Sequence, residues 1–202
     1  MKSFGPDQLD LVNCCSELAD GRSVSLHAFV DESRRNNTYL LAVALVPPGR
    51  LHKFRKALRC LLMPGQKELH CKKETPSRRK AIASRMVEER VSVRLYKRSC
   101  DQGDEPARQA CIRRLVEDLL EAGAHRLVLD SRAQRDQHDL LTIRTALGHV
   151  ALSTNLVYEH CRSSNDELLW IADFAAWCYG SGGEWRERVM PIVESIVDLD
   201  YP

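Results

Sequence analysis

The apolar run YLLAVALV at residues 39–46 most constrains the fold, because Pro47 and Pro48 follow it at once. A near-continuous apolar run that ends at prolines predicts a strand. Just upstream, residues 23–31 (SVSLHAFVD) alternate in character and predict a second strand. Asn36 and Asn37 lie between the two segments and favour a turn. Together these features predict an antiparallel hairpin with a short loop.

The rest of the chain alternates between helical and strand patterns. We expect helices at residues 50–62, 75–90, 105–122, 134–147 and 166–179, and further strands at 91–97, 125–130 and 155–160. Thr75 and Pro76 open the second of these helices, and Ser164 with Glu167 predicts a capping box for the last. The first three strands can pair antiparallel, whereas the last two, joined through helices, should be parallel. This order predicts an α/β fold: a ribonuclease H-like mixed five-stranded sheet with flanking helices and a helical insertion between strands 2 and 3.

The same pattern divides the chain into two parts. Residues 1–22 form an N-terminal extension without a strong period, and residues 23–202 form the ribonuclease H-like domain. Within that domain the helical insertion covers about residues 49–90, and a helical tail covers about residues 184–202. The length of 202 residues suits one domain of this kind.

Charge is unevenly distributed along the chain. Residues 50–98 contain 16 Lys and Arg against 4 Asp and Glu, although the net charge of the whole chain is only +2. From residue 165 onward there are 8 acidic and 2 basic residues. A basic segment beside an acidic remainder is typical of proteins that bind an anionic partner such as nucleic acid, RNA or DNA. An arginine-rich solvated surface would produce the same pattern.

Nothing in the sequence points to a membrane or to secretion. No segment approaches the ~20 apolar residues of a membrane span, and the N-terminus lacks the pattern of a signal peptide. The eight cysteines show neither CxxC nor zinc-ribbon spacing. We therefore expect a cytoplasmic protein with mostly buried thiols and no disulfide framework. The sequence leaves a homodimer open.

Three acidic residues stand where the pattern calls for something else. Asp31 ends the first predicted strand and Asp130 ends the fourth, and the carboxyl ends of strands are where ligands gather in α/β sheets. Asp173 shares a helix face with small and apolar residues, so its charge should be packed against the core. An ionised carboxylate there costs several kcal/mol unless it is paired or binds a metal.

Each acid also has an ordinary structural explanation. Asp31 could cap a turn, Asp130 could cap the next helix, and Asp173 could pair with a buried arginine. Taken together they favour one site, because the ends of the first and fourth strands are adjacent in a ribonuclease H-like sheet and the last helix crosses the same edge. Mg²⁺ or Mn²⁺ suits such oxygen ligands, and two ions ~3.5–4 Å apart can clamp a phosphodiester.

The chain resembles a known family in five short segments: HAFVDES, YLLAVALVPP, KELHCKK, HRLVLDSR and LLWIADFAAW. In this order they are similar to the domain-of-unknown-function family 3800, which is assigned a ribonuclease H-like fold. The resemblance covers roughly residues 24–180, and its strength lies in the order and spacing of the segments. One departure is Arg34-Arg35, where the family commonly has a glycine after Asp-Glu-Ser. These arginines either bring positive charge to a phosphate path or merely alter the hairpin.

The resemblance implies an acidic set of four residues: Asp31, Glu68, Asp130 and Asp173. Glu68 enters through the resemblance alone, since periodicity gives no reason to choose it over Glu74 or Glu117. Glu117 stays a rival because many ribonuclease H-like enzymes carry their glutamate on the helix after the third strand.

Three neighbouring residues are candidates for auxiliary roles. His70 follows Glu68 by two residues and could orient water or assist a leaving group, or it could be structural. Glu32 should point away from Asp31 if the strand continues. Lys97, at the end of the third strand, either contacts phosphate or is simply solvated.

These features predict a divalent-metal-dependent nuclease. Asp31, Glu68, Asp130 and Asp173 would bind two Mg²⁺ or Mn²⁺ ions, and the basic segment would hold the nucleic-acid backbone, with Arg34, Arg35, Lys72 and Lys73 as contacts. The alternatives are a non-catalytic module that binds nucleic acid or protein, and a phosphohydrolase of small nucleotides.

Overall fold

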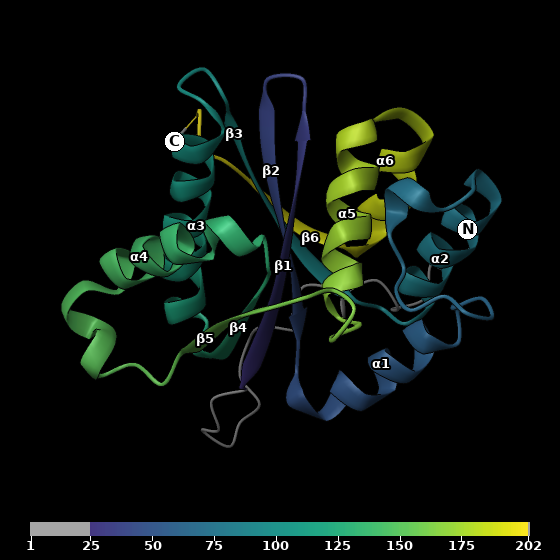
Figure 1. Ribbon diagram of the computed structural model, residues 1–202, viewed down its shortest axis with the longest axis horizontal. Coiled ribbons are helices and arrows are strands. Elements are labelled where there is room, and N and C mark those ends of the chain that lie inside the picture. Colours follow the sequence, from purple (N-terminus) through teal and green to yellow (C-terminus); the bar gives the residue numbers. More distant parts are fainter. Residues whose placement is uncertain (1–24, 202) are drawn as a thin grey trace, which may run out of the picture.

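A computed structural model of the chain describes residues 25–201. Its centre is a sheet of six strands in the order β5-β4-β1-β2-β3-β6 (Figure 1). The strands are β1 Leu26–Arg35, β2 Thr38–Val46, β3 Ser92–Ser99, β4 Ala124–Asp130, β5 Val157–Cys161 and β6 Val193–Asp198. Strands β1 and β3 each pair antiparallel with β2, whereas β4 is parallel to both β1 and β5. The mixed sheet with flanking helices predicted from the sequence is therefore confirmed.

The β1–β2 hairpin forms the middle of the sheet. Its register pairs Arg35 with Thr38, and Asn36 turns the chain with a φ of 51°, which asparagine tolerates better than most residues. Every residue of β2 after Thr38 is buried, which explains why this strand reads as a continuous apolar run. Each face of the hairpin is covered by helices, so each face has its own apolar core.

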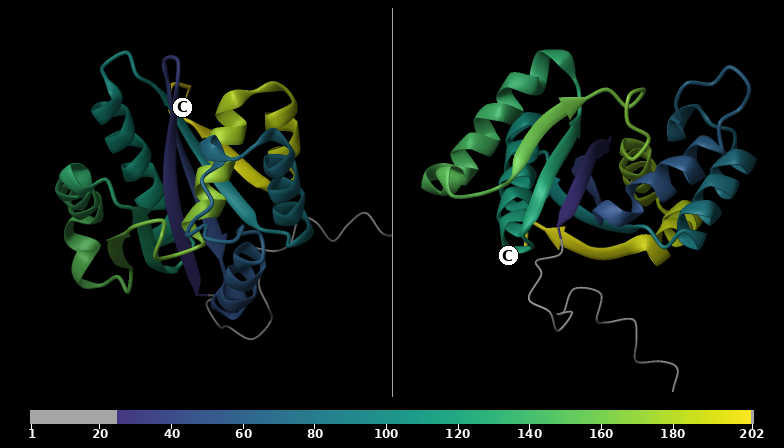
Figure 2. Two further views of the ribbon diagram at one scale, coloured as in Figure 1. Left: turned by 45° about the vertical axis from the view of Figure 1, so that its right-hand side comes forward. Right: turned by 90° about the horizontal axis from the view of Figure 1, so that it is seen from below.

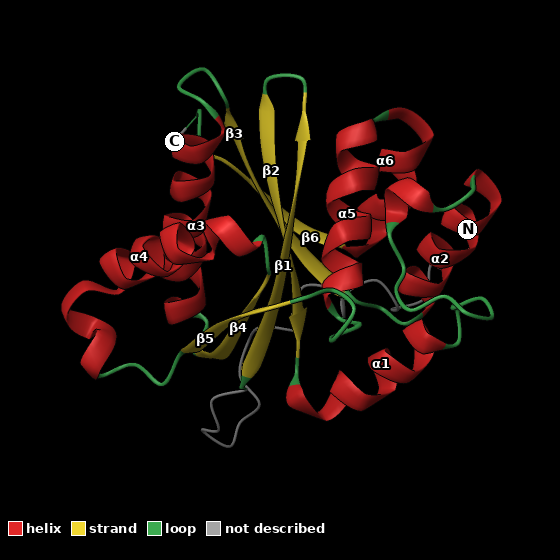
Figure 3. Ribbon diagram, viewed as in Figure 1, coloured by secondary structure: helices red, strands yellow, loops and turns green. Residues whose placement is uncertain are grey.

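The helices form two layers around the sheet, as Figures 2 and 3 show from different sides and by element type. One layer contains α3 Asp104–Glu121 and α4 Asp136–Leu147, whose core side chains pack with Ala28, Val30 and Leu41. The other contains α1 Leu51–Arg59, α2 Pro76–Glu88, α5 Leu169–Ser181 and α6 Gly183–Val189. Helix α5 lies along β1 and β2, and its core includes Phe29 and Ala42 from the sheet. The site described below lies on the α5 side.

The insertion between β2 and β3 forms mainly two helices, α1 and α2, within the range expected for it. Helix α2 begins as the sequence indicates, because the Thr75 side chain accepts a hydrogen bond from the Arg78 backbone N–H and Pro76 is the first helical residue. Helix α1 is tied to the segment before α5 by Arg55, whose Nε and Nη2 donate to Asp166 at 3.2 and 2.7 Å. The insertion thereby stabilises the start of α5. The capping box expected at Ser164 and Glu167 is wrong, because the Asp166 carboxylate accepts from the Leu168 N–H and α5 starts at Leu169.

Two expectations about the C-terminal part are corrected. The sheet has six strands rather than five, because the segment expected to be a helical tail forms α6 and then the strand β6. Strand β6 pairs in parallel with β3, and this pairing satisfies backbone groups that would otherwise lie at the edge of the sheet. The proposed extension at residues 1–22 lies outside the described residues.

Other expectations concern chemistry rather than topology. Among the cysteines that the structure describes there are six free thiols, and four of them are buried, as expected. Over residues 25–201, no helix combines the length and the apolar character needed to cross a membrane.

Candidate acidic active site

Four carboxylates from distant parts of the sequence meet on the α5 side of the sheet. Asp31 does not end its strand as expected, because β1 continues to Arg35; it lies on the same face of β1 as the buried Phe29. Asp130 is the last residue of the neighbouring strand β4, as expected. Asp173 comes from α5, and Glu68 comes from the segment between α1 and α2. We call Asp31, Glu68, Asp130 and Asp173 the acid cluster.

The negative charges of these carboxylates raise one another's pKa values. Burial raises the pKa of Asp31 well above its ordinary value, and the charges of Glu32, Asp173 and Asp130 raise it further. Burial also raises the pKa of Asp130, to about 6, with further contributions from Glu32, Asp173 and Glu68. A hydrogen bond from the Ser163 N–H acts in the opposite direction on Asp130 but does not outweigh burial. The cluster thus holds more negative charge than its surroundings neutralise.

Backbone and side-chain donors hold one oxygen of each carboxylate. Asp31 Oδ1 accepts from the Glu32 N–H at 2.7 Å. Asp173 Oδ2 accepts from the Cys71 N–H at 2.6 Å and lies 3.2 Å from His70 Nδ1. The second oxygen of each of these carboxylates receives no hydrogen bond from any described residue. One oxygen is therefore oriented and the other is left for a ligand.

Ser163 joins the other two members of the cluster and was missed by the sequence reading. Its N–H donates to Asp130 Oδ1 at 2.9 Å, and its hydroxyl donates to Glu68 Oε2 at 2.8 Å. The indole N–H of Trp170 donates to the Ser163 carbonyl at 2.7 Å and fixes the loop after β5. No short motif marks this serine, because its role depends on two partners that are distant in sequence.

His70 is the positively chargeable group nearest to Asp173. Its hydrogen bond to Asp173 is the main reason that the pKa of His70 is raised above its ordinary value, and burial opposes the effect. The side chain is 41% exposed, so it can meet solvent or a bound molecule. This contact places His70 at the rim of the acid cluster.

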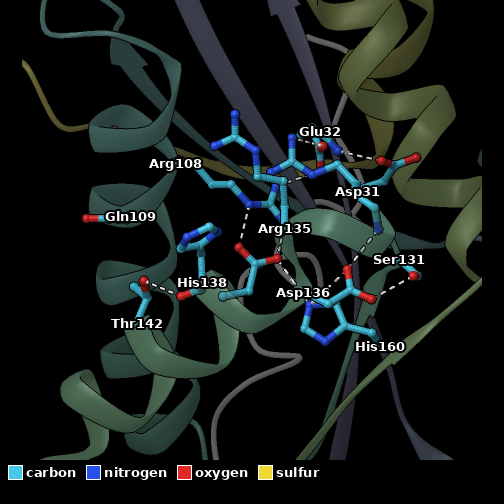
Figure 4. A network of polar contacts seen from close by, with 12 residues as sticks. Asp31, Glu32, Arg108, Gln109, Ser131, Arg135, Asp136, His138, Thr142 and His160 are labelled. Carbon is cyan, nitrogen blue, oxygen red and sulfur yellow. Dashed lines mark hydrogen bonds and ion pairs between the residues drawn. The ribbon is translucent and has the colours of Figure 1, made fainter.

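Glu32 points to the opposite face of the sheet, as alternation along a strand requires. There it accepts from Arg108 Nη1 at 2.7 Å and pairs with Arg132 at 2.8 Å. Arg108 is only 1% exposed and also donates to Asp139 at 2.7 and 2.6 Å, while His160 lies 3.1 Å from the same carboxylate. We call Glu32, Arg108, Arg132, Asp139 and His160 the paired network. Figure 4 shows Glu32, Arg108 and His160 of this network from close by, with Asp31 pointing away from Arg108.

The paired network has the opposite electrostatic balance. Burial alone would raise the pKa of Asp139, but the Arg108 hydrogen bonds and the contact with His160 lower it to about 2. Sequence reasoning missed this network, although Arg108 lies at helical spacing with Ile112 and Leu115 on the buried face of α3. A basic residue in an apolar stripe was the available signal.

The basic residues expected to contact nucleic acid divide into two groups. Arg34 pairs with Asp104 at 2.5 Å, and Lys97 pairs with Asp198 of β6 at 2.6 Å, so the chain itself neutralises both. Lys72 and Lys73 are exposed, and Lys73 lies 3.9 Å from Glu68. Arg35 lies over the Trp177 ring, with 5.2 Å between its guanidinium carbon and the ring centroid.

The rival glutamates lie elsewhere. Glu117 is exposed on α3, which packs on the opposite face of the sheet from the acid cluster. Glu74 is buried and bonded to Arg78 and Gln66. Of the three candidates, Glu68 is the one that lies with the other acids.

The donor chemistry of the acid cluster fits a hard divalent cation, since carboxylate oxygens are the ligands that Mg²⁺ and Mn²⁺ prefer. Asp31 and Asp173 each keep an oxygen that accepts no hydrogen bond from a described residue. As the side chains stand, however, no three His, Cys, Asp or Glu residues within 25–201 are close enough together to hold one ion. Closing the cluster on a cation would require side-chain movement.

Comparison with known proteins extends the result on the fold. No sequence-family model matches the chain, and comparison with curated proteins gave no match. Among solved structures, the chain is similar to one in the PCNA:RNase HII complex from Archaeoglobus fulgidus, with a TM-score of 0.51 and 18% identity. The match covers 81% of this chain and 76% of the other. At this identity the likeness supports the ribonuclease H-like fold alone.

Proposed function

We propose that this chain, built on a ribonuclease H-like fold, is a divalent-metal-dependent nuclease that hydrolyses phosphodiester bonds at the acid cluster. The main observation in favour is the environment of Asp31, whose raised pKa shows that burial and three neighbouring carboxylates disfavour its ionised form. Among the described residues, neither Asp31 nor Asp130 has an arginine or lysine partner. A bound cation would remove this imbalance.

In this proposal Asp31, Glu68, Asp130 and Asp173 hold Mg²⁺ or Mn²⁺, in a two-metal arrangement. The ions would supply positive charge to the phosphate as negative charge develops on it. Cys71 and Ser163 orient three of the carboxylates through the hydrogen bonds described above. His70 keeps Asp173 in place and, because its pKa is raised, can donate a proton to a leaving oxygen.

The proposed substrate is nucleic acid, RNA or DNA. The basic character of residues 50–98 supports this choice, as do the exposed Lys72 and Lys73 beside Glu68. Contacts of this kind are made to the phosphate backbone, so binding should weaken as salt rises. The resemblance to family 3800 belongs to the same proposal, since it supplies Glu68 as the fourth ligand.

A cleavage assay with Mn²⁺ and with Mg²⁺ tests the proposal on RNA, DNA and hybrid substrates. The wild-type protein should cut at least one of them, and Asp173→Asn should not. Glu117→Gln is the matched control, because it removes an exposed acid on the far face of the sheet. Equal cleavage by the wild type and Asp173→Asn would exclude the assigned site.

One observation favours a second candidate, a non-catalytic module that binds nucleic acid or protein. No three metal-binding side chains within residues 25–201 converge as they stand. Titration calorimetry with Mn²⁺ separates the two candidates. Heat of binding that disappears in Asp31→Asn supports the nuclease, and absence of binding by the wild type supports the module.

A further inference from the structure

Two arginines share one tryptophan beside the acid cluster. The guanidinium carbon of Arg79 lies 4.3 Å from the centroid of the Trp177 ring, and that of Arg35 lies 5.2 Å from it. Trp185 of α6 meets the same ring edge-on, with 5.8 Å between centroids. We call Arg35, Arg79 and Trp177 the arginine–tryptophan clamp.

The two arginines lack the acidic partners that their neighbours have. Arg34 pairs with Asp104, Arg78 with Glu74, and Lys80 with Glu184. Within the described part of the chain, neither Arg35 nor Arg79 forms an ion pair. Two cations held near one ring repel each other, so an anion between or beside them would be stabilising.

The remaining bonds of these arginines leave donors unused. Arg79 donates Nε to the Cys71 carbonyl at 2.7 Å and Nη2 to the Lys72 carbonyl at 3.0 Å. Arg35 donates Nη2 to Ser181 Oγ at 3.2 Å, and its buried Nε has no partner among the described residues. A guanidinium carries five N–H donors in a planar fork that matches phosphate oxygens. The bonds that are made fix the arginines in place, while the Nη1 group of each arginine makes no hydrogen bond to a described residue.

The clamp adjoins the acid cluster through three elements. Trp177 follows Asp173 by one turn of α5, which is ~6 Å along the helix axis. Arg35 follows Asp31 by four residues on the same face of β1. Arg79 binds the carbonyl of Cys71, whose N–H binds Asp173. A strand of nucleic acid held at the cluster would therefore continue past the clamp.

Gly180 allows the close approach of α5 and β1 at this point. A Cβ atom at position 180 would lie 2.8 Å from Cγ of Arg35 and 3.0 Å from Cδ1 of Leu40. The absence of a side chain thus makes room for the aliphatic stem of Arg35, whose guanidinium group lies over the ring of Trp177.

We infer that the arginine–tryptophan clamp binds a backbone phosphate of the nucleic-acid strand next to the phosphodiester at the acid cluster. This inference rests on the proposed function for the class of its ligand. Both guanidinium groups lie near the ring of Trp177, so the clamp contacts the backbone rather than stacking on a base. Backbone contacts position a strand without reading its sequence.

The test is a binding measurement that does not depend on cleavage. Fluorescence anisotropy with short labelled single-stranded DNA and RNA is recorded in EDTA over a series of salt concentrations. The variants are Arg79→Gln and Arg35→Gln, with Arg113→Gln as the control, because Arg113 is exposed on α3 at the opposite face. Each clamp variant should bind roughly tenfold more weakly at low salt. Its slope of log affinity against log salt should be smaller by ~0.7, as for one lost phosphate contact to a single strand.

Arg35→Lys controls for misfolding of the Arg35→Gln variant, because lysine keeps the positive charge and much of the aliphatic stem but lacks the planar guanidinium group. It should fold, and it should bind with an affinity between those of wild type and Arg35→Gln. Salt slopes equal to that of wild type in both Gln variants would overturn the proposed phosphate site. An equal fall in affinity in Arg113→Gln, or a wild type that binds no nucleic acid, would also overturn it. Binding with the expected slopes but no cleavage under any metal would leave the clamp standing and remove the nuclease.

Discussion

Asp31 and Glu32 are adjacent in sequence, yet the two faces of the sheet treat their charges in opposite ways. On the face of α3 and α4, Glu32 meets Arg108 and Arg132, and the paired network compensates its acids within the protein. On the face of α5, Asp31 meets Asp130 and Asp173, and within residues 25–201 the acid cluster forms ion pairs only with His70 and, at longer distance, Lys73. The acid cluster and the paired network both include a residue of β1, but only the paired network has arginines that neutralise its acids.

The paired network shows that this fold can place basic side chains next to buried acids and so stabilise their ionised forms. Asp139 has a pKa of about 2 because Arg108 and His160 outweigh its burial. Asp31 has a raised pKa because nothing of that kind opposes its burial. An uncompensated buried carboxylate is costly, and this cost is the reason that we propose a bound cation at the acid cluster.

The largest expected effect comes from Asp31→Asn. Cleavage should fall by more than about 10³-fold, which corresponds to ~4 kcal/mol of transition-state stabilisation. The free energy of unfolding without metal should rise by ~0.5–2 kcal/mol, because the change removes a charge that the folded state disfavours. Urea unfolding in EDTA and the cleavage assay measure the two quantities. A lower stability together with full activity would show that Asp31 is structural.

Arg108→Met should produce the next largest effect. Unlike Asp31→Asn, it should lower the free energy of unfolding. Removing the only buried cation of the paired network leaves Glu32 and Asp139 uncompensated, which should cost about 3 kcal/mol of unfolding free energy. Urea unfolding measures this loss, and Arg113→Met is the exposed control on the same helix. A loss below ~1 kcal/mol would mean that the paired network contributes little.

Glu68→Gln tests the member of the acid cluster with the weakest support from sequence. Cleavage should fall about 10²-fold, equivalent to ~2.7 kcal/mol, because one carboxylate ligand is lost while three stay. Glu117→Gln should leave the rate unchanged. The reverse result would transfer the fourth position to the helix after β3.

The smallest effect concerns pH. The pKa of Asp130 in the folded protein is about 6, above its unfolded value of ~3.9. The folded state therefore binds the proton more tightly, and the stability from this group falls as pH rises from ~4 to ~6. Asp139 has a lowered pKa of about 2, so its contribution is present above pH ~4 and is lost below it.

Urea unfolding of the metal-free protein across this range measures the difference. Asp130→Asn should flatten the slope between pH ~4 and ~6, and Asp139→Asn should flatten the loss below pH ~4. Saturating Mn²⁺ should also remove the fall in stability between pH ~4 and ~6, since a bound cation favours ionised carboxylates. A wild-type stability that rises with pH between ~4 and ~6, equally in Asp130→Asn, would contradict the assignment.

Sequence reasoning identified those parts of the molecule whose signal is local. The β1–β2 hairpin follows from a continuous apolar run beside a turn, and Asp173 draws attention because its helix face is small and apolar. Asp31 and Asp130 stand at or near the ends of apolar strand segments, so the topology that joins those strands also brings the two residues together. Glu68 has no such signal, and the family resemblance was needed to choose it.

The features that sequence reasoning missed depend on distant partners. Strand β6 is short, and its pairing with β3 joins parts of the chain that no local pattern connects. Arg108 looks like any basic residue on a helix until its partners Glu32 and Asp139 are known. Ser163 is an ordinary loop serine whose importance comes from lying between Asp130 and Glu68.

The pairing of β6 with β3 has a consequence for the order in which the molecule folds. Val93 pairs with Val193, whereas Arg35 pairs with Thr38 across a tight turn. Closing a long loop costs more chain entropy than closing a short one, and contacts of high sequence separation form slowly. We expect the hairpin to form early and the β6 edge to dock late. The acid cluster likewise joins residues as far apart in the sequence as Asp31 and Asp173, so its carboxylates should come together after the hairpin has formed.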